Sequence, residues 1–288
     1  MTREKRAEGM GMTSEDTRAA GAASAGGAGA LPFDSTVAHQ ARMYDYVLGG
    51  KDNYKADRDA AEAWLKVDPD AAFTAWANRA FLGRAVGFLA GDVGIRQFLD
   101  IGTGIATTDN THQVAQAIAP ASRVVYVDYD PIVLAHARAL LTSSSAGATD
   151  YVDADLRDTG AILSQAAELL DFTKPVAVTM LAVLHAIPDS DDPHAIVATI
   201  MDAVPSGSYL AISHGGSDLI PRATRDGIRG VSNQMQQRIA YRDREEVARF
   251  FAGLDLAAPG LVRVEEWRPE PDSRAGRSSA WCAVGRKR

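Results

Sequence analysis

An alternation of strand-like and helical patterns begins near residue 95, and it constrains the fold of this chain more than any other feature. Five apolar runs with the length of strands lie at 96–101, 123–128, 149–153, 175–181 and 208–213. Helical patterns separate them, at about 110–118, 131–142, 158–170 and 192–203. Strands that alternate with helices in this way form a parallel sheet with helices on both faces. The sequence therefore predicts an α/β, doubly wound domain over residues 95–288.

The C-terminal part of the chain has a different pattern. Two strand-like runs, LVRVEEWRP and SSAWCAVGRK, are joined by a loop rich in Pro, Gly and Arg. Two consecutive strands joined in this way pair in antiparallel fashion. We therefore predict an antiparallel hairpin at an edge of the sheet.

Two segments precede the alternating region. Residues 1–30 end in AAGAASAGGAGA, which has nothing large to bury, and this composition is typical of a disordered tail. Residues 31–94 carry three helical patterns, near 37–50, 52–67 and 71–91. We predict that these helices form an N-terminal lid over a ligand site.

Acidic residues stand at the ends of the first three strands of the alternating region. The first strand ends at Asp100, before Gly102-Thr103-Gly104; the second ends at Asp128, and the third leads to Asp155. In a doubly wound sheet the carboxyl ends of the strands meet at the ligand site. A carboxylate there accepts both hydroxyls of a ribose, and glycines allow the backbone to approach a ligand closely. These positions predict a binding site for an adenosine compound.

Two features distinguish between adenosine compounds. A nicotinamide or flavin dinucleotide requires the loop G-x-G-x-x-G for its pyrophosphate, but Thr107 stands where the third glycine is expected. The carboxylate of Asp100 repels a pyrophosphate and attracts a ligand that carries an amino group and a sulfonium. The sequence therefore favours S-adenosyl-L-methionine, with S-adenosyl-L-homocysteine as product, over the dinucleotide of an oxidoreductase.

Several motifs resemble those of class I S-adenosylmethionine-dependent methyltransferases, namely FLDIGTG, VVYVDYDP, YVDADLRD and LAVLHAIPD. More narrowly, ARMYDYVLGGKDNYKADRDAA, ANRAFLGRAVGFLA and GSYLAISH resemble an actinobacterial family of S-adenosyl methyltransferases, from about residue 32 to the C-terminus. The resemblance implies a Rossmann-like sheet of seven strands, with the last strand inserted antiparallel. Ala106 departs from the class, because many members have a glycine there.

The resemblance also implies roles for single residues. Asp100 would neighbour the methionine amino group, Asp128 would hold the ribose hydroxyls, and Asp155 would bind the adenine amine. The other cofactor-binding residues that the motifs imply are Gly102, Thr103, Gly104, Tyr129, Leu156, Met180 and Leu181. For Tyr129 and Leu156, ordinary packing is the alternative.

The stretch DYVLGGKDN places polar and aromatic groups around a Gly-Gly turn, which predicts contact with the cofactor through Tyr46, Gly49, Gly50 and Asn53. The alternative is a helix C-cap followed by the N-cap of the next helix. Arg79, in the third helical pattern, would reach the methionine carboxylate; the alternative is an exposed arginine.

Methyl transfer from a sulfonium is an in-line displacement that depends mainly on positioning, and some nucleophiles also need a base. His185, after the fourth strand, and His214, at the end of the fifth, are the candidate bases because the pKa of histidine suits this role. The alternative for His185 is a hydrogen bond within the cleft wall. The histidines show no metal-ligand spacing, so we expect no metal site.

Composition limits the setting of the reaction. The net charge of −7 argues against a nucleic-acid or membrane surface, and no apolar run is long enough for a membrane span. A single cysteine, Cys282, fits a reducing cytoplasm. We predict a cytoplasmic methyltransferase with a small-molecule acceptor, and a non-catalytic module that binds S-adenosylmethionine as the alternative. The oligomeric state is left open, a homodimer included.

Overall fold

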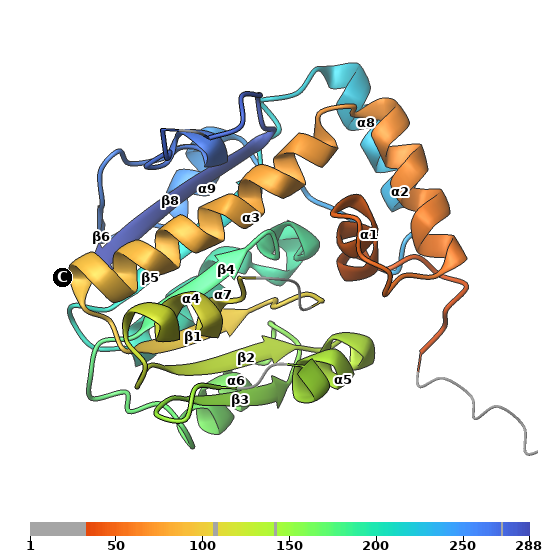
Figure 1. Cartoon of the computed structure of the whole chain (residues 1–288). Helices are drawn as coiled ribbons and strands as arrows, with labels where there is room; N and C mark the ends of the chain where they lie inside the picture. Colours follow the sequence, from red (N-terminus) through yellow and green to blue (C-terminus); the bar gives the residue numbers. More distant parts are fainter. Residues whose placement is uncertain (1–32, 106–108, 141–142, 272) are drawn as a thin grey trace, which may run out of the picture. The chain divides into compact units, whose positions relative to one another are not determined.

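Parallel strands form the centre of the fold. The structure, a computed structural model, describes residues 33–105, 109–140, 143–271 and 273–288, and within them eight strands form one sheet in the order β3-β2-β1-β4-β5-β8-β6, with β7 paired to β8. These are β1 Gln97–Ile101, β2 Arg123–Asp128, β3 Ala148–Asp153, β4 Ala177–Leu181, β5 Tyr209–Gly215, β6 Leu254–Leu256, β7 Val262–Arg263 and β8 Ala280–Lys287. The pairings among β1 to β5 are parallel (Figure 1), which confirms the predicted doubly wound sheet.

The two predicted C-terminal runs contain β7 and β8, which pair antiparallel with each other as predicted, but β8 is not itself an edge strand. β8 pairs with β5 on one side and with β6 and β7 on the other, so it lies inside the sheet. Cys282, Ala283 and Val284 are buried because a strand in this position is covered on both faces. β6 takes the edge, and its three residues are too few for a periodic signal. The inserted last strand agrees with the family resemblance, and β7 is an additional short strand.

The helices follow the predicted pattern as far as β5, but α8 and α9 were not expected. The elements are α1 Gln40–Val47, α2 Lys55–Val67, α3 Ala71–Phe88, the π-helical turn η1 Leu89–Val93, α4 Thr111–Ile118, α5 Pro131–Leu140, α6 Thr159–Ala166, α7 Pro193–Ala203, α8 Arg222–Ser232, α9 Arg244–Arg249 and the short turns η2 Leu184–Ala186, η3 Asp189–Asp191 and η4 Val264–Glu266. The sequence of α8, RATRDGIRGVS, has few apolar residues, and α9 is only six residues long. α9 is too short to show a period, whereas α8 is amphipathic, and its pattern was overlooked because so few of its residues are apolar.

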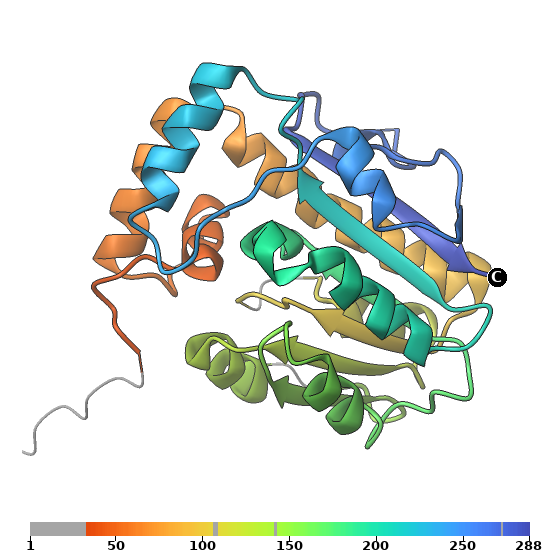
Figure 2. The same cartoon turned by 180° about the vertical axis from the view of Figure 1, so that it is seen from behind.

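Helices cover both faces of the sheet because successive residues of a strand point to opposite sides. In β1, Leu99 and Ile101 belong to the core shared with α6 and α7, whereas Phe98 belongs to the core shared with α3 and α4. Figure 1 shows α3 and α4 in front of the sheet, and Figure 2 shows the green helices α6 and α7 on the other face.

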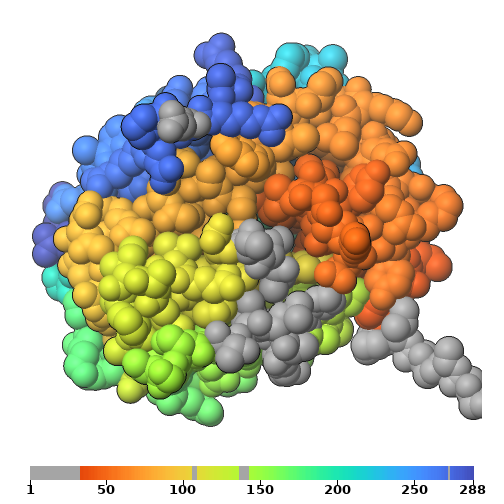
Figure 3. Space-filling view, viewed as in Figure 1, coloured from red at the N-terminus to blue at the C-terminus, as the bar shows by residue number. Residues whose placement is uncertain are grey.

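The N-terminal helices separate into two roles. α1 and α2 lie beyond the carboxyl ends of β1 and β4, whereas α3 runs along the sheet and buries Phe81, Ala85 and Val86 against it (Figure 1). Figure 3 shows the red and orange surface of α1 and α2 adjoining that of α3. α3 therefore belongs to the layer on the sheet, and α1 and α2 lie over the strand ends, where the sequence predicts a lid. The predicted tail, 1–30, lies outside the described residues, as do Ala106 and Thr107.

The segment after β5, which contains α8, packs beside α1 and α2 beyond the strand ends. α2 packs against α8, and Ala38 forms an isolated β-bridge with Met235. We call α1, α2, α8 and residues 233–241 the helical cover. It places a layer of side chains opposite the carboxyl ends of the central strands.

Candidate active site

A cavity of about 250 Å³ lies between the carboxyl ends of the strands and the helical cover. The sheet order changes direction beside β1, and this is where a doubly wound sheet binds its ligand. Twelve of the residues predicted from the sequence line this cavity: Arg79, Asp100, Gly102, Thr103, Gly104, Asp128, Tyr129, Asp155, Leu156, Leu181, His185 and His214.

Asp100 is a buried acid at the end of β1, with 5% of its surface exposed. Its two oxygens accept hydrogen bonds from Thr111 Oγ1 at 2.6 Å and Thr179 Oγ1 at 2.7 Å. Burial raises the pKa of Asp100, while these hydrogen bonds and the charge of Arg79 act in the opposite direction. A cationic ligand beside this carboxylate would offset the cost of its desolvation.

The loop after β1 requires glycine for steric reasons. Gly102 has a φ of +76°, and a Cβ atom there would lie 2.4 Å from the side chain of Val183. Thr103 Oγ1 donates to the carbonyl of Asp100, and the N–H of Gly104 donates to Asp128 Oδ2 at 3.0 Å. The end of β2 therefore holds the loop in place.

Asp128 organises the backbone around it. Its Oδ1 accepts the N–H groups of Tyr129 at 2.8 Å and Asp130 at 3.0 Å, in addition to the bond from Gly104 to Oδ2. Burial raises the pKa of Asp128, and the backbone hydrogen bonds oppose this shift. The carboxylate thus lines the cavity in a fixed orientation.

The sequence analysis missed a buried group that joins α1 to the end of β2. We call His39, Arg42, Asp57 and Asp130 the Arg42 network. Arg42 Nε binds both oxygens of Asp57 at 3.0 and 3.1 Å, and its Nη1 binds Asp130 at 3.1 Å. His39 contacts Asp130 at 3.0 Å and the hydroxyl of Tyr129 at 2.9 Å. Arg42 and Asp130 lie in the segments QARMYD and DYDP, which are far apart in the chain, and nothing in the sequence pairs them.

Asp155 and Leu156 lie at the rim of the cavity after β3. Arg157 binds both oxygens of Asp155, at 2.8 and 2.6 Å, and also pairs with Asp191. The hydrogen bond from Arg157 lowers the pKa of Asp155. Leu156 is buried. The acid is therefore in the predicted place, but it already has a cationic partner.

Of the predicted pair Met180 and Leu181, one residue faces the cavity. Leu181 lines the cavity, whereas Met180 is fully buried in the core that β4 shares with α7. Consecutive residues of a strand point to opposite faces, so only one of the two can face the ligand.

The DYVLGGKDN stretch folds around Asp45, and Val47 is its one residue that lines the cavity. Asp45 Oδ2 accepts hydrogen bonds from the N–H of Asp52 at 2.9 Å and from Asn53 Nδ2 at 2.8 Å, and the Asp45 carbonyl accepts the N–H of Gly50. Tyr46 points to Glu62, with 3.1 Å between its hydroxyl and Glu62 Oε1. Tyr46, Gly49, Gly50 and Asn53 are absent from the residues that line the cavity. The structure thus places this stretch in the turn between α1 and α2.

This turn provides the first test of the structure. A Cβ atom on Gly50 would lie 1.9 Å from Asp45 Oδ1, and Asp45 is buried and held by its hydrogen bonds. We expect Gly50→Ala to lower the free energy of unfolding by about 1–3 kcal/mol, measured by denaturant titration. Gly83→Ala is the matched control, because it lies in α3 with no atom within 4 Å of its Cβ position and should stabilise by up to about 1 kcal/mol. Equal stability of the two variants would contradict the proposed packing of Gly50.

The two candidate bases differ in their hydrogen bonds. Arg242 donates from Nη1 to His214 Nε2 at 2.9 Å, so Nδ1 of His214 carries the proton and donates to the carbonyl of Gly215. Nδ1 of His185 is buried and has no hydrogen-bond partner among the described residues. Burial, followed by the charge of Arg242, lowers the pKa of His185 to about 4, so its ring is neutral at pH 7. Of the two, His185 is thus the better placed to accept a proton.

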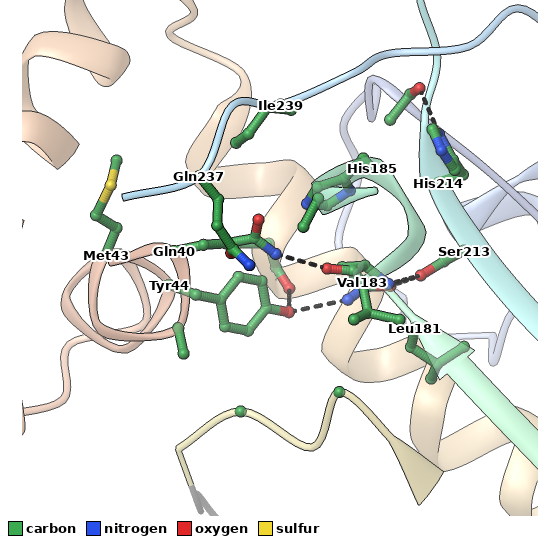
Figure 4. A pocket seen from close by; sticks show the side chains of 18 of the residues that line it. Gln40, Met43, Tyr44, Leu181, Val183, His185, Ser213, His214, Gln237 and Ile239 are labelled. Carbon is green, nitrogen blue, oxygen red and sulfur yellow. Dashed lines mark hydrogen bonds between the residues drawn. The ribbon is translucent and has the colours of Figure 1, made fainter. Parts of the chain in front are cut away.

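Figure 4 shows how the two sides of the cavity meet. Gln40 and Tyr44 extend from α1 toward Val183, and Gln237 and Ile239 approach from the segment after α8. Gln40 Nε2 donates to the carbonyl of Ala182 at 2.9 Å, and the N–H of Ala182 is bound by Ser213 Oγ at 2.9 Å. Ala182 has a φ of +52°, so these bonds hold a strained backbone beside Leu181.

Comparisons with known proteins agree with this geometry. The model of a family described as S-adenosyl methyltransferase matches residues 28–288. The crystal structure of a DUF574 family protein from Streptomyces avermitilis is 43% identical with a TM-score of 0.85, over 88% of this chain and 99% of that one. A crystal structure from Thermobifida fusca is 38% identical with a TM-score of 0.79, over 88% of this chain and 96% of that one.

A more distant likeness concerns the fold alone. The crystal structure of an S-adenosylmethionine-dependent methyltransferase from Anabaena variabilis is 14% identical, with a TM-score of 0.50, over 79% of this chain and 94% of that one. No curated protein matches this chain.

Proposed function

Since the chain belongs to the S-adenosyl methyltransferase family, we propose that its cavity binds S-adenosylmethionine and that a small molecule beside it receives the methyl group. The observation that carries this proposal is the position of Asp100 and Asp128. Both are buried acids at neighbouring strand ends, and both line one cavity with the glycine loop between them. Such a site suits a nucleoside that carries positive charge.

The site residues divide between the parts of this ligand. Asp128 would accept the two ribose hydroxyls, with the backbone of Gly102, Thr103 and Gly104 close to the ligand. Asp100 would attract the amino group of the methionine part, and Arg79, on the facing side of the cavity, its carboxylate. Each role follows from the attraction of opposite charges. The two side chains are close enough for the charge of Arg79 to oppose the rise in the pKa of Asp100, so they could bind the two neighbouring groups of one methionine part.

The adenine would lie farther along the strand ends. Tyr129 and Leu156 offer the flat and apolar surface that a base requires, and both line the cavity. Asp155 would share its oxygens between Arg157 and the exocyclic amine of the adenine. Its contribution to the binding of the adenine would therefore be smaller than the sequence alone suggested.

When bound, S-adenosylmethionine supplies an electrophilic methyl group. Leu181 and the clamped backbone of Ala182 would form one wall for the reacting atoms, and positioning there accounts for much of the catalysis. His185 would take the proton of a hydroxyl nucleophile. A ring with a pKa of about 4 is a weak base, so it would take this proton after methylation, from the strongly acidic oxonium, whereas an amine would have to react already deprotonated.

The helical cover would act as the lid of this site. Gln40 ties α1 to the backbone after β4, and the Arg42 network ties α1 and α2 to the end of β2. A closed cover excludes water from the reacting groups. The role assigned to 31–94 therefore narrows to α1 and α2, joined by α8 and residues 233–241.

The setting of the reaction rests on charge and cysteine content. A net charge of −7 favours a small acceptor over nucleic acid, and one buried cysteine suits a reducing cytoplasm. Sequence likeness to proteins of Streptomyces and Thermobifida supports an actinobacterial source. No described helix is both long and apolar enough to cross a membrane.

Two experiments, carried out one after the other, test the binding of the cofactor and the transfer of its methyl group. Calorimetric titration should show S-adenosylhomocysteine bound and NAD not bound, and methyl-labelled S-adenosylmethionine should label a small molecule of a cell extract only when the protein is present. No binding of S-adenosylhomocysteine would overturn the proposed function. Binding with no transfer to any extract would favour a non-catalytic module instead.

A further inference from the structure

The cavity extends beyond the part that the cofactor roles use. We call Trp64, Asp68, Met235, Ile239 and Tyr241 the far end of the cavity, since all five line it and none has a cofactor role. Along α3, Ala71 and Arg79 both line the cavity and are about 12 Å apart at the usual rise of an α-helix. Asp68, just before α3, is thus separated from the arginine that would bind the methionine carboxylate.

Asp68 is the most unusual group at the far end. Only 4% of its surface is exposed, and Oδ2 has no hydrogen-bond partner among the described residues. The side chain is bound by the backbone of Asp70, and burial raises the pKa of the carboxyl group. A buried carboxylate oxygen without a hydrogen-bond donor destabilises the protein. A ligand that donates a hydrogen bond to this oxygen would remove that cost, and the free energy recovered would favour binding.

Gln40 presents a second acceptor without a donor. Its Nε2 is committed to the carbonyl of Ala182, which fixes the orientation of the amide, and Oε1 is buried without a partner. In Figure 4 Gln40 and His185 face the same space beside Val183. Two acceptor oxygens, one from α1 and one from the residue that follows α2, thus lie on one cavity and lack N–H or O–H donors among the described residues.

The charged residues that line the cavity indicate whether the ligand at the far end is a cation or an anion. Arg79 is the one lysine or arginine among the described residues that line the cavity, and it lies at the cofactor end. The far end has the acid Asp68 beside two aromatic rings: Trp64 and Tyr241 are 6.5 Å apart, and Asp68 acts with burial to raise the pKa of Tyr241. Aromatic faces and a carboxylate attract a cation and repel an anion.

We propose that the far end of the cavity recognises the amino group of an amine-bearing methyl acceptor, with Asp68 accepting its N–H donors and Trp64 and Tyr241 contacting its apolar part. This inference rests on the proposed function and specifies its acceptor. Acceptors that place a carboxylate or phosphate at this position are excluded by the charge of Asp68. Gln40 would accept a second donor of the same molecule, closer to His185.

The test measures binding of amines to the protein saturated with S-adenosylhomocysteine. The probes are phenethylamine, tyramine and tryptamine, each compared with the carboxylate of the same ring: phenylpropionate, hydroxyphenylpropionate and indolepropionate. Calorimetry should show at least one amine bound about ten-fold or more tightly than its carboxylate. Asp68→Asn should lower the affinity for that amine by about ten-fold or more and leave the affinity for S-adenosylhomocysteine unchanged.

Asp59→Asn is the matched control, because it removes the same charge from an exposed position of α2 and should leave amine affinity within about two-fold. The inference is overturned if every amine fails to bind the saturated protein, if the carboxylates bind as tightly, or if Asp68→Asn retains amine affinity. Failure of S-adenosylhomocysteine to bind in the first step would contradict the proposed function itself, so the two failures are separable.

Discussion

Asp128→Asn should weaken the binding of S-adenosylhomocysteine by about 100-fold, a loss of about 2–4 kcal/mol. The reason is that the proposed ribose contacts are hydrogen bonds to a charged acceptor, whereas an amide offers one neutral oxygen and an NH₂ group that cannot accept. The measurement is calorimetric titration of both proteins at the same pH and salt concentration.

The control for this variant lies on the neighbouring strand. Asp153 pairs with Asp128 in the sheet register, but it is exposed and does not line the cavity. Asp153→Asn should therefore bind S-adenosylhomocysteine like the unchanged protein. Asp128 also accepts three backbone N–H groups, so the unfolding of Asp128→Asn without ligand must be measured alongside. Affinity within about three-fold of the original in a folded variant would show the ribose assignment to be wrong.

Arg42→Met should lower the free energy of unfolding by about 3–5 kcal/mol. Arg42 is 1% exposed and pairs with Asp57 and Asp130, which are 0% and 3% exposed. Methionine fills much of the volume but leaves two buried carboxylates without their cation, and removal of one partner from a buried ion pair is strongly destabilising. Denaturant unfolding followed by circular dichroism gives this value.

Arg222→Met is the comparison variant for Arg42. Arg222 is 87% exposed on α8, and its contact with Asp226 is 3.8 Å, so its loss should change stability by no more than about 0.5 kcal/mol. If Arg42→Met were as stable as Arg222→Met, the Arg42 network would not hold α1 and α2 to the end of β2. The proposal that these helices form a fixed cover would then lose its support.

Local signals were sufficient for the part of the site that belongs to the sheet. The acids Asp100 and Asp128 each follow an apolar run directly, and Gly102 follows Asp100 by two residues. A parallel sheet brings such strand ends together whatever the loops between them contain. The alternation of strand residues would also have excluded Met180, because Leu181 takes the face toward the cavity.

A conspicuous motif was a poorer guide. DYVLGGKDN drew attention because glycines and polar groups concentrate there, yet the hydrogen bonds of its turn centre on Asp45 within the same stretch. Glycines and polar residues are typical both of a turn whose side chains bind its own backbone N–H groups and of a loop that binds a ligand. Only the surroundings of Asp45 distinguish the two, and the sequence does not contain them.

The sequence by itself determined the alternating α/β framework and the acidic strand ends, since both depend on residues that are neighbours in the chain. Tertiary structure alone decided the cover and the far end of the cavity, where Asp68 meets Tyr241, and the pairing of Arg42 with Asp130. These partners are distant in sequence, and the amphipathic period of α8 does not show which element it packs against. Contacts of that kind arise from packing of the whole chain, so no local pattern encodes them.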